Sequence, residues 1–492
     1  MLTVSKMLSV GVFAAFGLVL PRMVSIQLNG LYTLMSTLLF FGSMAATFGV
    51  PTILIRKIAR APDQTSQVFA AARRALLLGA LLSGAAVMTY LLVEMSIQGG
   101  IDQERVVLGC LVVTIILFDA FGGLGEAIFQ SREEMALPAI LDVFSGVIRA
   151  GGGTICLLLL PAHQGVMGVF ICFLIGSIMR ALVLSKLARR TLPSGSLPPT
   201  SNSEAWSLVR ESMGVALFRL MRMLRNRFDA ILIGILIVPA AGMSLAETSD
   251  IARGFYGQAM RVVFVFHTFT MALNTAIYPR IARLSSSADS SSTGREFRRV
   301  VRYQSWWVAP LAAAVFIWAE QLSGWFGSDY RYGIAGIDGN TAVVLKILAG
   351  AALLDCIGGP VGMLLVANKE MDRKLPIFGG IFAATSIGLN IFLIPRYGIV
   401  GAAWASVGAA VVEFLLKARY AGKLLGDMRH LREMLPYLGL AGVIGLSCYH
   451  FLPARPFVGL GLGAVAYIFL TFVFGLVDPG ISERLRRRLK NG

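Results

Sequence analysis

The chain has 492 residues, of which 56% are apolar and only 14% are charged. Soluble proteins average roughly 25% charged residues, so this composition excludes an ordinary soluble enzyme or binding domain. The net charge of +17 would suit a nucleic-acid-binding protein, but the basic residues gather in short loops between apolar stretches, which indicates a membrane protein.

Apolar stretches long enough to cross a hydrocarbon core of about 30 Å recur from the first ten residues to position 478. We therefore predict an all-α, polytopic membrane protein with about 14 transmembrane helices. The first stretch lacks a small-residue cleavage site, so we expect a retained helix and not a signal peptide. The predicted spans are 7–26, 32–54, 69–95, 106–129, 137–160, 164–187, 213–236, 248–275, 303–325, 341–366, 375–396, 400–422, 434–452 and 456–478.

The Lys and Arg residues alternate strongly between loops. If the N-terminus is cytoplasmic, the inward loops and tails hold 30 of them and the outward loops hold four. Cytoplasmic loops of membrane proteins carry such an excess of positive charge. The sequence therefore predicts that both termini face the cytoplasm.

An internal repeat relates the two halves of the chain. Residues 52–60 resemble 275–283, the prolines Pro138 and Pro376 follow a leucine at the start of two spans, and 165–168 resembles 398–401. Each match lies six spans apart, so the halves share one orientation, an arrangement typical of transporters with two lobes. An ancient duplication kept for packing alone is the alternative. The predicted parts are an N-terminal lobe at 1–190, a cytoplasmic linker at 191–212, a C-terminal lobe at 213–425, and two further helices with a basic tail at 426–492.

Arginines inside the predicted spans are the candidate substrate-binding residues. On the seventh span, Arg219, Arg222 and Arg225 fall with Asp229 within an arc of about 120°, which makes one face of the helix cationic. Guanidinium groups can grip a phosphate with two parallel hydrogen bonds, so a diphosphate head group is the expected ligand. The alternatives are structural ion pairs and side chains that reach the inner interface. The predicted substrate-binding set is Arg22, Arg149, Arg219, Arg222, Arg225 and Arg261.

Two acids, Asp355 and Glu413, are candidates for coupling transport to a proton or another cation, because ionisable groups within spans are costly and often functional. The five cysteines show no paired metal-ligand spacing, and no GxxxxGK[ST] phosphate loop occurs. We therefore expect no metal, no cofactor and no enzymatic activity. An interior-negative potential of 100 mV favours outward movement of one negative charge by about 2.3 kcal/mol, which makes export the expected direction.

Three segments resemble the polysaccharide transporter branch of the multidrug/oligosaccharidyl-lipid/polysaccharide exporter superfamily. They are Leu20-Pro21-Arg22 continuing through 30–32 to 49–51 and Arg56, then 229–234, then 395–403. The resemblance implies a flippase that moves undecaprenyl-diphosphate-linked oligosaccharides across the bacterial inner membrane for O-antigen, capsule or exopolysaccharide assembly. It implies as partners the lipid-linked oligosaccharide, membrane lipids and a polysaccharide polymerase and export complex, and no nucleic acid.

Other functions stay open at this point. Lipid II flippases of the same superfamily carry arginines on the first and eighth helices, where Arg22 and Arg261 lie here, but Arg22 lacks the adjacent aspartate expected of them. Multidrug extruders of the superfamily usually have twelve spans and bind cations. A polymerase acting on lipid-linked glycans would need a larger outward loop than 327–340, which offers only Asp329 and Asp338 as acids. A non-transporting scaffold would not require unpaired cavity arginines.

Overall fold

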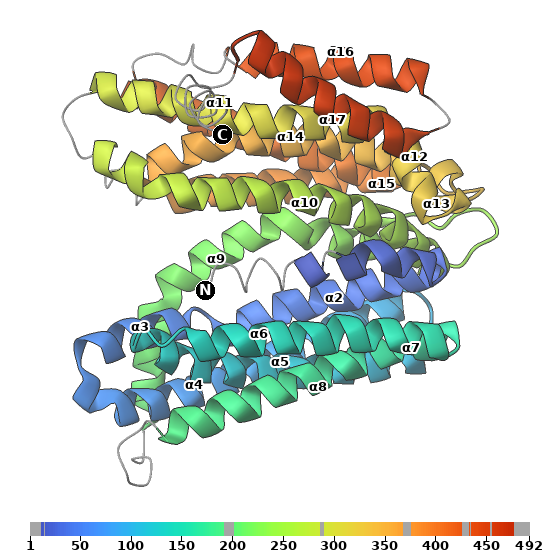
Figure 1. The fold of residues 1–492 in the computed structure, drawn as a ribbon. Helices are drawn as coiled ribbons and strands as arrows, with labels where there is room; N and C mark the ends of the chain where they lie inside the picture. The colour runs from blue at the N-terminus through green and yellow to red at the C-terminus, as the bar shows by residue number, and fades with distance from the viewer. Residues whose placement is uncertain are drawn as a thin grey trace. The chain divides into compact units, whose positions relative to one another are not determined.

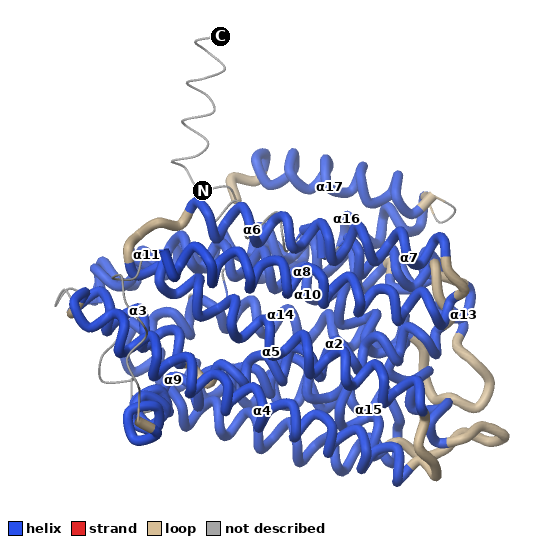
Figure 2. Tube along the Cα trace, turned by 90° about the horizontal axis from the view of Figure 1, so that it is seen from below, coloured by secondary structure: helices blue, strands red, loops and turns tan. Residues whose placement is uncertain are grey.

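The computed structural model describes residues 11–13, 15–190, 201–285, 290–367, 375–425, 432, 434–452 and 455–476. Regular secondary structure in these ranges is helical throughout, without a strand (Figure 2), and the predicted all-α fold is confirmed. The chain divides into two compact units, Met1–Gly257 and Gln258–Gly492. The predicted division into lobes, linker and C-terminal helices stays a prediction, and residues 191–200 of the linker lie outside the described residues.

The first unit is a bundle of long helices in which α5 packs most extensively against α8 and also contacts α2, α3 and α4. Figure 1 shows α4, α5, α6 and α8 running side by side. The start of α10 and the whole of α9 also belong to this unit. Its elements are η1 (Leu20–Arg22), α2 (Ile26–Thr47), α3 (Val50–Arg60), η2 (Pro62–Gln64), α4 (Thr65–Ile97), α5 (Gln103–Ser131), α6 (Ala136–Val147), the π-helical turn η3 (Ile148–Gly152), α7 (Gly153–Leu159), α8 (Ala162–Arg190), α9 (Asn202–Leu236) and α10 (Leu245–Ser285).

The second unit is built around α14, which packs against α11 and α15. The last two helices, α16 and α17, pack on each other and on α11, where Tyr437, Tyr467 and Ala309 form a small apolar core. These contacts attach the two helices that lie outside the sequence repeat to the rest of the second unit. The elements of the unit after α10 are α11 (Ser290–Ile317), α12 (Ala319–Phe326), α13 (Ser328–Tyr332), α14 (Thr341–Ala367), α15 (Leu375–Leu425), α16 (Leu435–Phe451) and α17 (Pro456–Val473).

One predicted span differs from the structure, and one predicted break between spans agrees with it. The second predicted span is broken between α2 and α3, where Phe48 and Gly49 have φ angles of 42° and 74°, both in the left-handed region that ends helices. Pro51 then lies at the start of α3, where a missing N–H does no harm. The eleventh and twelfth predicted spans are the two helical parts of α15, which are separated at Gly398 with φ 52° and ψ −133°, within the predicted gap at 397–399.

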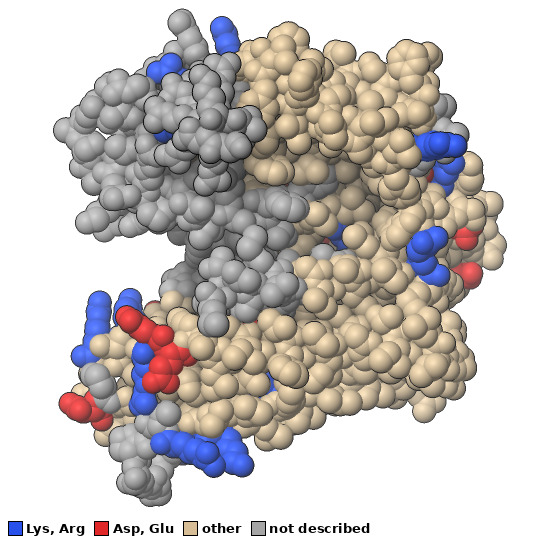
Figure 3. All heavy atoms as spheres, in the orientation of Figure 1, with Lys and Arg blue, Asp and Glu red and all other residues tan. Residues whose placement is uncertain are grey.

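The described helices have the length and composition of membrane spans. Eight are long and apolar enough to cross a bilayer, and three shorter apolar helices accompany them, including 11–22 from the first predicted span. Large apolar side chains such as Leu82, Leu158 and Phe144 are exposed along the helices. On the face drawn in Figure 3, charged side chains gather toward helix ends and few lie between them. Such an apolar surface suits lipid and identifies a multi-pass membrane protein.

Glycines allow α2 and the start of α10 to touch along their backbones. A Cβ added at Gly30 would overlap the carbonyl oxygen of Asp250, and one added at Gly254 would overlap that of Ile26. The Asn29 amide also donates a hydrogen bond to the Gly254 carbonyl oxygen at 3.3 Å. Small residues at such crossings let membrane helices approach closely.

Replacing Gly30 with alanine should therefore destabilise the first unit, because backbone cannot move aside as a flexible side chain can. We expect a loss of about 1–3 kcal/mol, typical of overpacking, measured as thermal unfolding of the purified protein in detergent. Gly123→Ala on α5 is the matched control, since nothing lies within 4 Å of its added Cβ. Equal stability of the two variants would contradict the close contact.

Candidate functional site

Five charged side chains form an ion network inside the first unit. Asp119 and Glu126 lie on α5, Asp142 on α6, Arg149 on η3 and Arg180 on α8. Each of the five side chains is between 13% and 21% exposed. We call this set the five-residue network. Because its members come from three separate stretches of sequence, α5, α6 with η3, and α8, it depends on the tertiary fold.

Arg149 forms one of the ion pairs of the network, with Asp119. Its Nη2 lies 2.7 Å from Asp119 Oδ1 and 2.5 Å from Ser177 Oγ, and its guanidinium is 5.9 Å from the centre of the Phe173 ring. Asp119, Arg149 and Ser177 each fall near the middle of their predicted spans. The π-helical turn at 148–152 interrupts the α-helical hydrogen-bond pattern at Arg149, a feature often found at functional positions in helices.

Arg180 joins two carboxylates closer to the cytoplasmic ends of the predicted spans. Its Nε donates to Asp142 Oδ1 at 2.7 Å, and its Nη2 pairs with Glu126 Oε2. The other Glu126 oxygen accepts a hydrogen bond from Gln130 Nε2 at 2.6 Å. The Arg180 guanidinium lies within reach of the membrane interface, yet it forms two ion pairs within the protein.

A second group of charges, here called the outer cluster, is buried near the α4–α5 and α9–α10 connections. Arg253 Nη2 lies 2.6 Å from Glu94 Oε1, and Arg105 Nη2 lies 2.5 Å from Asp250 Oδ2. Arg253 has no exposed surface, and its Nε donates to the Ala230 carbonyl oxygen at 2.9 Å. Half-exposed Asp102 also lies 3.4 Å from Arg105 Nε, and the buried Glu94 and Asp250 share the two arginines, so the outer cluster clamps α4, α5, α9 and α10 together.

The outer cluster was largely missed by sequence reasoning. Arg105 lies in the predicted loop between the third and fourth spans, and Glu94 lies inside the third predicted span. An acid within an apolar span was the available signal, since it requires a partner. Its partners Arg253 and Arg105 come from other helices, and no local pattern identifies them.

The predicted substrate-binding arginines fall into three structural situations. Arg149 already has a carboxylate partner, Arg22 is exposed at the end of η1, and Arg261 is half-buried and donates to Gln258 Oε1 at 2.9 Å. The predicted cationic face of the seventh span belongs to α9. The side chains of Arg219, Arg222 and Arg225 lie outside the described part of the structure. The role of all six arginines in substrate binding stays a prediction.

The two predicted coupling acids lie in the second unit. Asp355 on α14 is half-buried, with Oδ2 3.8 Å from His267 Nε2 on α10. Glu413 on α15 is buried and lies 2.7 Å from Lys417 Nζ, one helical turn away. Both acids therefore have basic neighbours, and their part in coupling stays a prediction.

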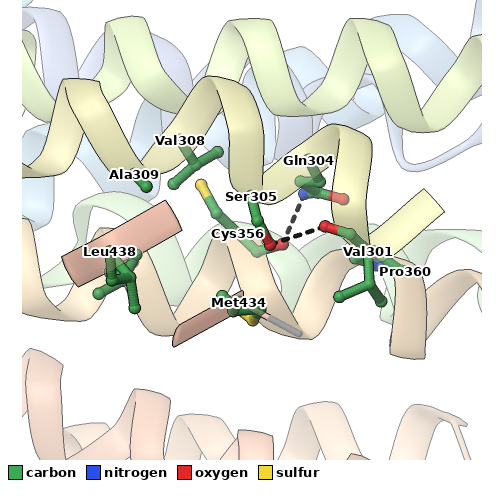
Figure 4. A pocket seen from close by; sticks show the side chains of 10 residues that line it. Val301, Gln304, Ser305, Val308, Ala309, Cys356, Pro360, Met434 and Leu438 are labelled. Carbon is green, nitrogen blue, oxygen red and sulfur yellow. Dashed lines mark hydrogen bonds between the residues drawn. The ribbon is translucent and has the colours of Figure 1, made fainter. Parts of the chain in front are cut away.

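A small cavity lies in the second unit between α11, α14 and α16. Pro360 has no N–H to bond the Cys356 carbonyl oxygen one turn earlier, and Gln304 Nε2 donates to that oxygen instead at 2.5 Å (Figure 4). The cavity measures about 10 Å³, room for about one water molecule, and is lined mainly by apolar side chains such as Val308 and Leu438. Its volume excludes it as the site of a glycan lipid.

The chain is similar to known proteins over most of its length. A family model described as "Polysaccharide biosynthesis protein" matches residues 19–331. The "Probable flippase AglR" of Haloferax volcanii is 24% identical over 472 residues, which cover 94% of this chain and 90% of that protein.

The fold also matches solved membrane transporters. A lipid II flippase MurJ in an inward closed conformation aligns with a TM-score of 0.73 at 12% identity, covering 96% of this chain and 98% of that one. An inward-facing multidrug resistance MATE family transporter of the MOP superfamily aligns with a TM-score of 0.61 at 14% identity, covering 85% and 95%. These likenesses confirm the predicted polytopic membrane fold.

Replacing Arg253 with alanine should strongly destabilise the protein, because Glu94 and Asp250 would remain buried with one cation fewer. The expected loss is about 3–5 kcal/mol in thermal unfolding in detergent. The matched control is Arg56→Ala, which removes an exposed ion pair with Glu211 and should cost no more than about 1 kcal/mol. A hydrogen bond from Lys57 also holds the pKa of Glu211 below its usual range, so that acid keeps a partner in the control. Similar losses in the two variants would contradict the buried clamp.

Proposed function

Because the chain belongs to the family of polysaccharide biosynthesis proteins, we propose that it is a flippase for lipid-diphosphate-linked oligosaccharides. The predicted membership of the polysaccharide transporter branch of the multidrug/oligosaccharidyl-lipid/polysaccharide exporter superfamily is confirmed by the family match together with the transporter fold. The one observation that carries the proposed activity is similarity to a probable flippase along nearly the whole of both chains.

The chemistry of the arginines supports an anionic cargo. On α9, Arg219, Arg222 and Arg225 are three residues apart, so their Cα positions lie along one side of the helix. Planar guanidinium groups suit the oxygens of a diphosphate, and in a low-dielectric site each contact is stronger than in water. Arg22 and Arg261 are proposed to add to this anion-binding set, and Arg149 to do so from within its ion pair with Asp119.

The proposed direction is from the cytoplasmic to the external leaflet. Charge in the loops supports cytoplasmic termini, and an interior-negative membrane potential favours outward movement of the anionic head group. The proposed location is a bacterial inner membrane, and the proposed cargo is an undecaprenyl-diphosphate-linked repeat unit for O-antigen, capsule or exopolysaccharide. A polysaccharide polymerase and export complex would then consume the exported unit.

A deletion strain should separate this activity from that of a polymerase. Without the flippase, lipid-bound oligosaccharide repeat units should accumulate on the cytoplasmic leaflet, where an impermeant glycan-labelling reagent added outside the cell cannot reach them. Loss of a polymerase would instead leave single repeat units accessible from outside. Accessible repeat units in the deletion strain would therefore argue against flipping and favour the enzyme.

Within the complemented strain, Arg222→Ala should abolish polymer export at unchanged protein abundance, because a central cation of the α9 face is lost. The matched control is Arg227→Ala, which removes an arginine of the same helix that helical spacing places on another side. Export is measured as surface polymer and abundance by immunoblot. Unchanged export by the Arg222 variant would remove this residue from the proposed site.

A further inference from the structure

Helix α4 exposes a row of leucines on one side. Four of them are between 41% and 73% exposed, namely Leu77, Leu78, Leu81 and Leu82. The opposite side of the same helical turns carries Ala72, Ala75 and Leu76, which are buried in a core that also contains residues of α3, α5, α8 and α9. The leucine side of α4 is therefore turned toward the acyl chains of the membrane.

The exposed side of α4 has the length of a hydrocarbon core. It continues to Ile97, which is 48% exposed, and about 20 residues of α-helix span about 30 Å. The turn before Leu77 therefore lies at the level of the lipid head groups. Loop charge predicts that this end of α4 faces the cytoplasm, so these are head groups of the cytoplasmic leaflet.

Two arginines without a counter-ion occupy that turn. Arg73 and Arg74 each precede an exposed leucine by one helical turn, at positions i and i+4. Both are exposed, and neither forms an ion pair or a hydrogen bond with the residues that the structure describes. The one acid of α4, Glu94, is buried in the outer cluster at the other end of the helix. The leucine side thus ends in a pair of unbalanced cations.

Exposed cations nearby on α3 are balanced by an acid. Arg56 and Lys57 share the carboxylate of Glu211, at 2.8 and 2.7 Å. Long basic side chains at helix ends often extend toward water without a specific ligand, and that is the alternative for α4. What distinguishes Arg73 and Arg74 is the combination of free guanidiniums with an adjoining acyl-chain surface.

We propose that Arg73 and Arg74 bind the phosphate of an anionic phospholipid, whose acyl chains lie along the leucines of α4. Two guanidiniums offer several N–H donors to the phosphate oxygens, and the negative lipid charge offsets the cations. An amphiphile with one anionic end matches an apolar face that is charged only at its cytoplasmic end. The head group of a zwitterionic lipid brings its own ammonium, which the arginines repel. This lipid site goes beyond the proposed flippase function and does not depend on it.

Native mass spectrometry of the purified full-length protein tests the site. Phosphatidylglycerol and phosphatidylethanolamine with the same acyl chains are titrated separately. The wild type should bind phosphatidylglycerol about tenfold more tightly, because each basic residue near an anionic head group contributes about fivefold in affinity. The double variant Arg73→Gln/Arg74→Gln should reduce this preference to less than about twofold. An unchanged preference would overturn the proposal.

A second double variant is the matched control. Arg189 and Arg190 are also exposed and at the cytoplasmic end, but they follow Leu182, the exposed leucine of their helix α8, by two turns or about 10 Å. Arg189→Gln/Arg190→Gln removes the same charge and should keep the preference. An equal loss in both variants would show diffuse attraction by surface charge and would contradict a defined site.

A charge-preserving variant separates the ligand from the shape of α4. Arg73→Lys/Arg74→Lys should retain most of the preference, because lysine also binds phosphate as a point charge. A loss as large as in the glutamine variant would refute binding through charge. A dimer that only the glutamine variant dissolves, without any lipid preference, would show that a second copy covers this face and would also overturn the proposal.

Photolabelling locates the lipid in a bilayer. A phosphatidylglycerol with a photoreactive group near the glycerol end of one acyl chain should label residues 75–85 of the wild type in nanodiscs. The glutamine variant should lose this label, whereas the Arg189 and Arg190 control should keep it. Labelling spread evenly over the exposed helices would exclude the site. None of these measurements uses a glycan lipid, so their failure would leave the proposed flippase function intact.

Discussion

A guanidinium or carboxylate in the interior of a membrane protein needs a partner, and this requirement organises the first unit. Leaving one such group unpaired costs more than most single packing contacts contribute. Arg253 and Arg105 meet their acids near two helix connections, and Arg149 and Arg180 meet theirs within the spans. The helices that carry these groups are consequently held in one relative arrangement.

The two charge groups differ in how far their side chains are buried. Glu94, Arg105, Asp250 and Arg253 of the outer cluster are almost fully buried, which suits a permanent clamp. The five-residue network has an extra acid, is partly accessible and includes a π-helical turn.

Backbone adjustments allow long apolar helices to pack and bend. Gly30 and Gly254 permit backbone contact between α2 and α10, and Gly398 allows the kink within α15. Where Pro360 leaves a carbonyl oxygen without its helical donor, Gln304 replaces the missing N–H. In an apolar surrounding, an unsatisfied backbone group costs several kcal/mol, which explains why a polar side chain is retained there.

The sequence by itself determined the helical class, most spans and the family, because apolar periodicity, loop charge and short motifs are local properties of the chain. It also identified Arg149 as a basic residue within a predicted span. Only the tertiary structure decided that Asp142 pairs with Arg180, 38 residues away, and Arg105 with Asp250, 145 residues away. Such pairings depend on which helices pack together, and no short-range pattern encodes that choice.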